Sequence, residues 1–396
     1  MLIDFGLQPV SNRYLAVPDA SEFQHPFMLG YCEACGLLQL VEPTPFDELR
    51  SHFPWIYYTE PEGHLGNLVE DIIQLPGITK DSVFCGISGH EKSTFDRLGR
   101  QGYANSWQLN PNDDLECSVP HLGVETIQQL LTSKATKQIV ERKGKSTVVI
   151  ARSLLEHSHT PLILMEALQQ LIEPGGYVVF EVPDSTRQLE AGDYSMLWEE
   201  HVFYFTPYTL QKSLEKGGFH VCSLKVYQTP MMDSMIAIAQ KVANNESAYS
   251  VQEDKMQINL ESKRAFEFAT MYPNRKKLLQ STLSDNAQKG NIVLLGAGHL
   301  ACSFINIMQL GDFIQLILDD HPHKNSMYMP GSRLKICSTD ILEHKDSNIH
   351  LCLLSVGHES ERKIINQKKE FGARGGKFCS IFPMSDHALI SHPLTS

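Results

Sequence analysis

The chain has 396 residues, of which 42% are hydrophobic, enough for roughly two to three domains with buried cores. Its 34 basic and 46 acidic residues give a net charge of -12 without a long Lys/Arg run, which disfavours generic binding to nucleic acid or to an anionic membrane. No apolar run is long enough to cross a bilayer, the start lacks a signal-peptide pattern, and nine scattered cysteines are typical of a reducing compartment. We therefore expect a cytoplasmic protein whose partner is a small molecule.

Residues 1–65 predict a small loop-rich module, because they are rich in Pro, Gly and aromatic residues and show little helical period. Within YCEACG, Cys32 and Cys35 have the spacing of half a zinc ribbon. A structural zinc site needs four ligands, and no second CxxC pair occurs in the chain. The missing ligands would have to come from His25, His52 or His64. Zinc is thus possible, and a pair of free thiols is the more common meaning of an isolated CxxC.

Residues 66–241 predict an α/β domain. A helical segment, GNLVEDIIQL, precedes the apolar runs in SVFCGISG, STVVIARSLLEH and GGYVVFEVPD, and the last two are separated by the helix-period segment PLILMEALQQLI. Short apolar runs bounded by Gly, Pro or charge indicate buried parallel strands. FHVCSLKVYQ and MMDSMIAIAQ predict the strands that close the sheet.

Ligands of open α/β sheets bind beyond the carboxyl ends of the strands. The first strand runs into FCGISGHEKS, where Gly86 and Gly89 would let a ligand approach, although no acid stands at the strand end before them. The second strand ends in WQLNPNDD, with Asn110 near the usual ribose-binding position and two aspartates slightly later. Later strand ends add five candidate liners, Arg152, Glu156, His157, Glu181 and Asp184. Alternatively, Glu156 and His157 cap or solvate a helix end.

Residues 242–288 predict a helical connector, and residues 289–396 a second α/β domain that begins with NIVLLGAGHL. Here Gly296, Gly298 and Ala301 mark a tight turn into a helix, and Asp319 and Asp320 follow at the distance of a ribose-binding acid. This pattern is typical of a dinucleotide-binding domain. Rossmann-like domains that hold no dinucleotide share the same turn, and the sequence leaves both readings open.

Taken in order, these segments resemble the zinc-ribbon-containing sugar C-methyltransferases of deoxysugar biosynthesis. The similar segments are LQPVSNRYL, YCEACGLLQL, ARSLLEH, LIEPGGYVVFEVPD, EEHVFYFTPYTL, GAGHLACSFIN and DDHPHKNSMYMPGSRL. The resemblance implies an N-terminal cysteine module, a central class I methyltransferase domain that binds S-adenosylmethionine, and a C-terminal Rossmann-like domain.

The resemblance also implies an active site around WEEHVFYF. In the family an adjacent Glu-His pair lies in the active site with the histidine as the proposed base, and these positions are Glu200 and His201 here. A histidine suits the removal of a proton next to a ketone. Tyr57 and Tyr58 match the family's Tyr-rich segment and would stabilise the enolate oxygen. The alternative for WEEHVFYF is a strand or loop edge with solvated acids and buried aromatic rings.

The implied function is S-adenosylmethionine-dependent C-methylation of a nucleotide-linked keto-deoxysugar or a similar polar ketone. The residues expected at the methyl donor are Gly86, Gly89, Asn110, Arg152, Glu156 and His157. Those expected at the nucleotide end of the substrate are Gly296, Gly298, His299, Asp320 and Lys324. A second hypothesis is a binding protein that keeps the fold and holds a nucleotide or nucleotide sugar without methyl transfer. A dehydrogenase is a weaker third.

The chain differs from the family pattern in three places. The cysteine pair upstream of Cys32 is missing. The acidic glycine-rich turn of the donor site, E/D-x-G-x-x-x-G, is replaced by FCGISGHEKS. Trp198 stands where the family often has a tyrosine, three residues before the histidine.

Overall fold

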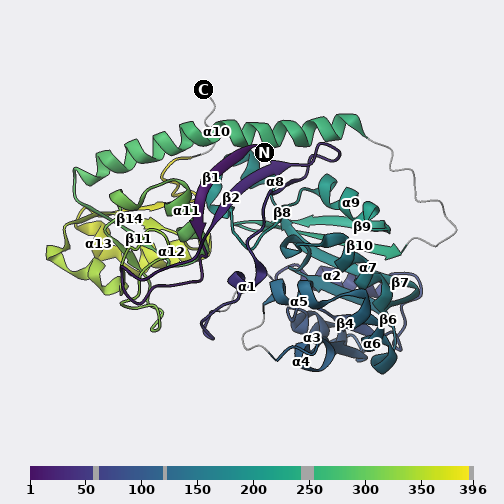
Figure 1. Cartoon of the computed structure of the whole chain (residues 1–396). Coiled ribbons are helices and arrows are strands. Elements are labelled where there is room, and N and C mark those ends of the chain that lie inside the picture. Colours follow the sequence, from purple (N-terminus) through teal and green to yellow (C-terminus); the bar gives the residue numbers. More distant parts are fainter. Residues whose placement is uncertain (57–61, 119–122, 242–253, 392–396) are drawn as a thin grey trace. The chain divides into compact units, whose positions relative to one another are not determined.

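The computed structural model describes residues 1–56, 62–118, 123–241 and 254–391 (Figure 1). The chain divides into two compact units, each built from separate stretches of sequence. Unit 1 comprises Met1–Gly30, Thr186–Glu199 and Lys263–Ser396. Unit 2 comprises Tyr31–Ser185 and Glu200–Ser262.

Unit 2 is built on a six-stranded mixed sheet. Its strands lie in the order β5 (Ser106–Gln108), β4 (Phe84–Gly86), β6 (Ser146–Arg152), β7 (Ile172–Asp184), β10 (Asp233–Lys241) and β9 (Phe219–Tyr227). The first four are parallel, whereas β10 is antiparallel to both of its neighbours. The parallel strands and the closing pair predicted from the apolar runs are confirmed.

Both faces of this sheet are buried, as parallel strands require. Along β6, Val148 and Ile150 join one hydrophobic cluster, whereas Val149 and Ala151 join the other, following the two-residue period of a strand. The helices of the unit are α1 (Phe46–Leu49), α2 (Leu65–Ile73), α3 (Lys92–Arg100), α4 (Pro111–Asp114), α5 (Val124–Leu130), α6 (Ser133–Lys143), η1 (Leu155–His157), α7 (Pro161–Leu171) and α9 (Pro207–Lys216). The predicted helices GNLVEDIIQL and PLILMEALQQLI correspond to α2 and α7.

Two short strands connect the cysteine segment to WEEHVFYF within unit 2. β3 (Leu38–Leu40) pairs antiparallel with β8 (Phe203–Tyr204), and Leu38 lies opposite Tyr204. Directly after β8, Thr206 caps α9 through a capping box, and Pro207 occupies the first turn. The sequence TPYT therefore ends the aromatic segment and starts the helix.

Unit 1 contains a five-stranded parallel sheet in the order β13 (Ile336–Cys337), β12 (Leu316–Leu318), β11 (Asn291–Leu295), β14 (Ile349–Leu354) and β15 (Lys377–Ser380). Its further elements are β1 (Ile3–Pro9), β2 (Gln24–Tyr31), α8 (Thr186–Ala191), η2 (Tyr194–Met196), α11 (His299–Ile307), η3 (Gly311–Phe313), η4 (Thr339–Glu343), η5 (Lys345–Ser347), α12 (His358–Gln367) and α13 (Lys369–Ala373). β1 and β2 pair antiparallel. The second α/β block predicted from the sequence is thus confirmed.

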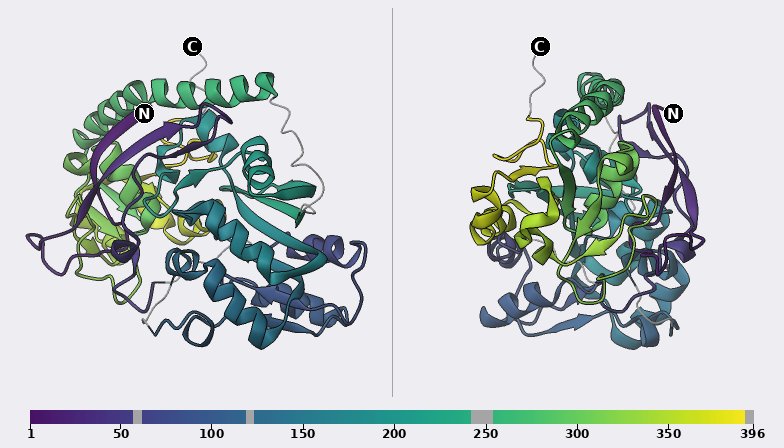
Figure 2. Two further views of the ribbon diagram at one scale, coloured as in Figure 1. Left: turned by 45° about the vertical axis from the view of Figure 1, so that its right-hand side comes forward. Right: turned by 90° about the vertical axis from the view of Figure 1, so that its left-hand side faces the viewer.

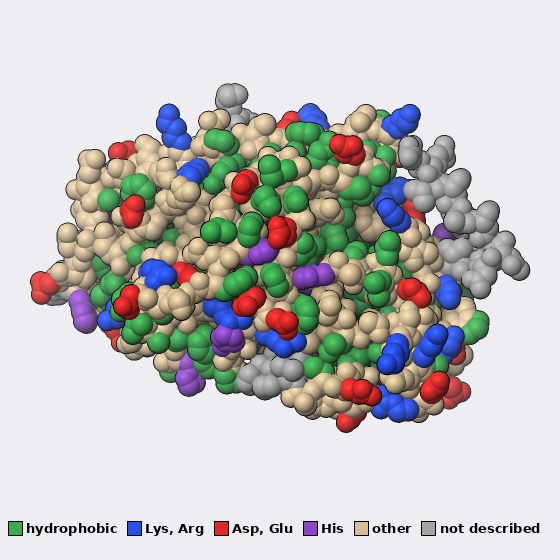
Figure 3. Space-filling model, viewed as in Figure 1, with side chains coloured by type: hydrophobic (Ala, Val, Ile, Leu, Met, Phe, Trp, Pro, Cys, Tyr) green, Lys and Arg blue, Asp and Glu red, His purple; other side chains and the backbone are tan. Residues whose placement is uncertain are grey.

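The predicted helical connector is α10 (Lys255–Ala287), which continues as one helix through Pro273 (Figure 2). Within the described ranges, no helix has the length and apolar character needed to cross a membrane. On the face shown in Figure 3, acidic and basic side chains are interspersed.

The two glycines that open the βα turn of unit 1 meet different surroundings. Gly296 has a φ of +105°, and a Cβ there would lie 2.7 Å from the Ser355 carbonyl oxygen. Gly298 has an ordinary φ of -109°, and nothing lies within 4 Å of its Cβ position. Only Gly296 is therefore required by the fold itself.

We expect Gly296→Ala to lower the free energy of unfolding by about 1–3 kcal/mol, because alanine is strained at this φ and clashes with Ser355. The matched control Gly298→Ala should stay within about 0.5 kcal/mol of the unaltered protein. Urea denaturation followed by circular dichroism measures both. Equal stabilities for the two variants would contradict this account of the turn.

Candidate active site

The carboxyl edge of the unit 2 sheet carries the residues on which the chemistry can depend. β6 ends at Arg152 and leads through Ser153, whose φ of +49° is rare for a residue other than glycine, into η1. The backbone N–H of Val202 donates a hydrogen bond of 2.7 Å to the carbonyl oxygen of Glu156. This bond places the segment after WEEH directly beside η1.

Glu156, His157 and His201 consequently form one cluster. Their ligand-type atoms all lie within 4.8 Å of one another, and the two imidazole rings meet edge to face with 4.7 Å between their centroids. Glu156 and His157 are buried, whereas His201 is partly exposed. The cluster unites the two Glu-His sequences, LEH and EEH, that the sequence analysis singled out separately.

His157 is a neutral imidazole at ordinary pH. Burial lowers its pKa to about 3, the nearby His90 and His159 act in the same direction, and a hydrogen bond to the backbone of Glu200 opposes them. Because that bond raises the pKa, His157 is its donor. The other ring nitrogen of the neutral tautomer is then an acceptor.

The remaining predicted catalytic residues are placed as follows. Glu200 is 4% exposed, so the acid beside His201 is buried and not solvated. Tyr57 and Tyr58 lie outside the described residues. Tyr204, which the sequence analysis did not single out, lies 6.5 Å from His201 between ring centroids and is buried. Its signal in the sequence was the aromatic run that follows the histidine.

The turn after β4 differs at its two glycines. A Cβ on Gly86 would lie 2.9 Å from both the Cβ of Glu91 and the ring of Phe95, so the protein's own side chains already pack against this glycine. Gly89 has a φ of +93° and nothing within 4 Å of its Cβ position. The turn therefore leaves room for a ligand at Gly89, which fits a methyl donor bound at this edge of the sheet.

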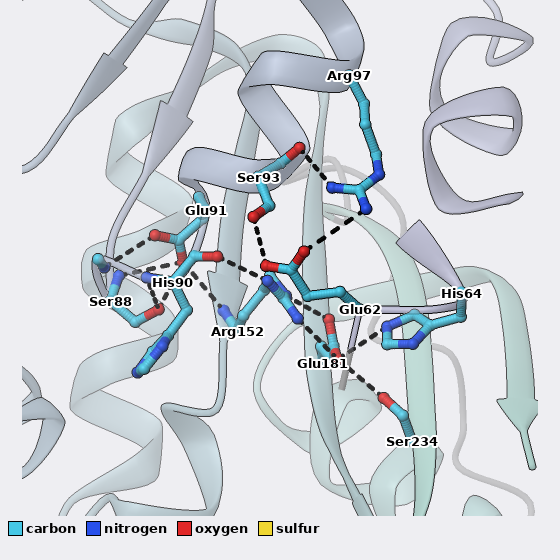
Figure 4. A network of polar contacts seen from close by, with 11 residues as sticks. Glu62, His64, Ser88, His90, Glu91, Ser93, Arg97, Arg152, Glu181 and Ser234 are labelled. Carbon is cyan, nitrogen blue, oxygen red and sulfur yellow. Dashed lines mark hydrogen bonds and ion pairs between the residues drawn. The ribbon is translucent and has the colours of Figure 1, made fainter. Parts of the chain in front are cut away.

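Arg152 is anchored by an ion pair in the wall of this site (Figure 4). Its Nε lies 2.5 Å from Oε2 of Glu181, and a second guanidinium nitrogen donates to the carbonyl oxygen of His90 at 2.6 Å. Glu181 also interacts with His64 and Ser234, each at 2.9 Å. Burial by itself would raise the pKa of Glu181, but hydrogen bonds from His64 and Arg152 lower it to about 2. The pair is thus ionised throughout the physiological range.

The polar residues after β5 serve local structure. Oδ1 of Asn110 accepts hydrogen bonds from the backbone N–H groups of Asn112 and Asp113 and so caps α4. The buried carboxylate of Asp114 pairs with Arg142 at 3.2 Å and with Lys143 at 2.7 Å. At the end of β5 itself stands Gln108, which the sequence analysis did not consider.

In unit 1 the GAGHLA turn is occupied by the chain's own groups. Oδ2 of Asp319 accepts the backbone N–H of Ala297 at 2.9 Å, and Nζ of Lys324 contacts that oxygen at 3.0 Å and the Ala297 carbonyl oxygen at 2.8 Å. Asp320 instead accepts hydrogen bonds from the backbone N–H and hydroxyl of Thr339. Of the predicted nucleotide-binding positions, Gly298 has open space beside it.

The last predicted residue of this group, His299, stacks on Trp198 with 4.3 Å between ring centroids. Burial lowers the pKa of His299 to about 4, and the charge of Lys324 acts in the same direction. Beside Trp198, Glu199 accepts hydrogen bonds from the backbone N–H and hydroxyl of Ser11 at 2.6 and 2.8 Å. WEEHVFYF is therefore divided between the units, with Trp198 and Glu199 in unit 1 and the rest in unit 2.

Cys32 and Cys35 form a tight turn in which the N–H groups of Cys35 and Gly36 donate to the carbonyl oxygen of Cys32. Both cysteines are partly buried, and burial raises the pKa of Cys35 to about 11. Across the described part of the chain, no third potential ligand gathers with them. The described residues thus do not fit a four-ligand structural zinc site.

Three family models match the chain in succession. The model described as "Putative zinc binding domain" matches residues 1–49, "Methyltransferase domain" matches 89–224, and "C-methyltransferase C-terminal domain" matches 220–383. Among curated proteins, the C-methyltransferase NovU of Streptomyces niveus is 23% identical over 402 residues, spanning 98% of this chain and 94% of that protein.

The comparison with solved structures returned methyltransferases as well. The 1,6-didemethyltoxoflavin-N1-methyltransferase of Burkholderia thailandensis is 11% identical, with 46% of this chain and 78% of that chain covered and a TM-score of 0.31. The glycopeptide N-methyltransferase MtfA is 10% identical, with 45% and 93% covered and a TM-score of 0.29.

The matched models follow the order in which the cysteine module, the central domain and the C-terminal domain were predicted. The relative extends this agreement over nearly the whole chain. The chain is therefore an S-adenosylmethionine-dependent methyltransferase of the α/β class I fold, and over nearly its whole length it is similar to a C-methyltransferase.

Proposed function

We propose that this enzyme methylates a carbon next to a ketone in a nucleotide-linked deoxysugar or a similar polar ketone, with His201 as the base. The observation that carries the proposal is the cluster of His201 with Glu156 and the neutral His157 beside the carboxyl ends of the strands. The similarity to a C-methyltransferase supports carbon as the methylated atom. The resemblance to the sugar-modifying family supports the class of acceptor.

Carbon–carbon bond formation needs a nucleophilic carbon. S-adenosylmethionine supplies an electrophilic methyl group on its sulfonium when it is bound. His201 removes the proton from the carbon beside the ketone, so that the C–H electron pair becomes an enolate and the proton stays on the imidazole. The enolate carbon then forms the new bond to the methyl group while the methyl–sulfur bond breaks, and the electron pair of that bond stays on the sulfur of the leaving S-adenosylhomocysteine. Holding both reactants in one site lowers the barrier.

Glu156 and His157 assist the base in different ways. The carboxylate of Glu156, whose oxygen lies within 4.8 Å of a His201 nitrogen, stabilises the imidazolium that forms. His157 donates a hydrogen bond to the backbone of Glu200, the residue before His201, and so restrains the position of His201. The second ring nitrogen of His157 can accept a hydrogen bond from a hydroxyl group of the polar substrate.

We expect His201→Gln to lower kcat by roughly 10²–10⁴-fold, because glutamine cannot accept the proton. The affinity for S-adenosylhomocysteine should stay within about threefold, since the donor turn is untouched. Calorimetric titration measures the affinity, and a methyl-transfer assay with a keto-deoxysugar nucleotide measures kcat. In D₂O, with S-adenosylhomocysteine bound, the unaltered enzyme should exchange the acidic proton of the acceptor for deuterium. The His201→Gln variant should not catalyse this exchange.

Unchanged turnover in His201→Gln would show that the base lies elsewhere. The same three side chains also have the spacing of metal ligands. Activity that chelation abolishes and a divalent cation restores would therefore assign the cluster to a metal and contradict the base role. Glu156→Gln is the matched variant, and a smaller loss than in His201→Gln is expected because it removes a charge beside the base and not the base itself.

The buried neutral His157 makes the stability of unit 2 depend on pH. Its folded pKa of about 3 lies below the ordinary value of 6.5, so between these values the unfolded chain binds a proton that the folded chain does not. The contribution is fully present above 6.5 and is lost as the pH falls toward 3, by about 1.4 kcal/mol per unit. We expect His157→Gln to remove this part of the acid destabilisation. Urea denaturation at about pH 7 and about pH 5 measures it, and equal losses for both proteins would contradict the assignment.

A further inference from the structure

Glu91 is a fully buried acid at the start of α3 that the acceptor chemistry does not use. Its carboxylate accepts hydrogen bonds from the N–H and hydroxyl of Ser88 at 3.2 and 2.6 Å and from the N–H of Gly89 at 2.9 Å (Figure 4). It also accepts from Nε2 of Gln108 at 3.1 Å and from the backbone N–H of Arg152 at 3.3 Å. Five neutral donors thus converge on one carboxylate.

These donors share one location in the fold. Gln108 is the last residue of β5, Arg152 is the last residue of β6, and Ser88 and Gly89 form the turn after β4. β5, β4 and β6 are adjacent parallel strands, so the carboxylate joins three neighbouring strand ends. In an open α/β sheet, a ligand binds beyond these ends.

The family pattern places an acid on the strand, two residues before the first glycine. Here that position is Phe84, whose side chain is buried in the core and cannot accept hydrogen bonds as a carboxylate does. Glu91 reaches the same turn from its other side. We propose that Glu91 replaces the strand acid as the positioning residue of the methyl-donor site, holding the turn so that the open face of Gly89 meets the donor. This role concerns the donor alone and does not depend on which acceptor is methylated.

The test is Glu91→Gln in the full chain. Glutamine has the same shape, but its NH₂ group must face an N–H or amide donor of Gly89, Ser88 or Gln108, so the turn can no longer be held as it is. We expect the affinity for S-adenosylhomocysteine to fall by at least about tenfold, and KM for S-adenosylmethionine to rise in proportion. At saturating donor, kcat and the acceptor KM should stay within about threefold.

Two further variants serve as comparisons for Glu91→Gln. Glu62→Gln is the matched control, because Glu62 lies in the same polar network but is exposed, and its contacts are with Ser93 and Arg97 of α3 (Figure 4). It should leave donor affinity unchanged. Ser88→Ala removes one of the five donors and keeps the carboxylate, so a smaller loss of about two- to fivefold is expected.

Glu91→Gln protein that melts like the unaltered protein and binds S-adenosylhomocysteine within about twofold would overturn the proposal. A lowered melting temperature with unchanged affinity would also overturn it, because the role would then be structural only. If Glu91→Gln does not fold, Ser88→Ala decides: reduced affinity supports the proposal, and unchanged affinity overturns it. Absence of binding to the unaltered protein would overturn this role and leave the acceptor-side base to be tested separately by proton exchange.

Discussion

The site in unit 2 depends on the buried ion pair between Arg152 and Glu181. Two charges removed from water are tolerated only when hydrogen bonds satisfy them, and removal of one partner from such a pair typically costs about 3–5 kcal/mol. Glu181 meets this condition through Arg152, His64 and Ser234, so the pair ties β6 to β7 and β10. The backbone of Arg152 in turn bonds to Glu91, and η1 with its Glu-His pair begins three residues further on. The Glu91 turn and the Glu156–His157 segment are therefore both joined to this charge pair through Arg152.

In both units, an acidic side chain of the protein accepts hydrogen bonds from the glycine-containing turn, which follows β4 in unit 2 and β11 in unit 1. In unit 2 this acid is Glu91, which accepts the N–H groups of Ser88 and Gly89, and in unit 1 it is Asp319, which accepts the N–H of Ala297. Backbone N–H groups at such turns need an acceptor, whether it comes from the protein or from a ligand. A glycine pattern alone therefore does not distinguish a turn that binds a ligand from one that is satisfied internally. The open space at Gly89 and at Gly298 is the more informative feature.

In the proposed mechanism, Glu91 holds the methyl-donor site rigid, whereas His201 on the acceptor side takes up a proton. Glu91 has its carboxylate saturated by five neutral donors, which suits a residue that holds a backbone in place. His201 is partly exposed beside a buried carboxylate and a neutral imidazole, which suits a group that gains and loses a proton. Because burial keeps His157 neutral, the cluster does not hold two adjacent positive charges when His201 is protonated. The low pKa of His157 is thus compatible with the proposed role of His201 as the base.

The sequence by itself predicted the two α/β units, the apolar strands at their centres, the resemblance to C-methyltransferases and the two Glu-His segments, because apolar period and motif order are local properties of the chain. It also predicted both Gly86 and Gly89 for the donor site, but it could not distinguish Gly89, which has open space beside it, from Gly86, which packs against Glu91 and Phe95. Only the tertiary structure showed that Asn110 caps a helix, that Arg152 is held by Glu181, and that Glu91 joins three strand ends. The physical reason is that a polar side chain's role depends on which partners satisfy it. Those partners come from strands that are neighbours in the sheet but distant in the sequence.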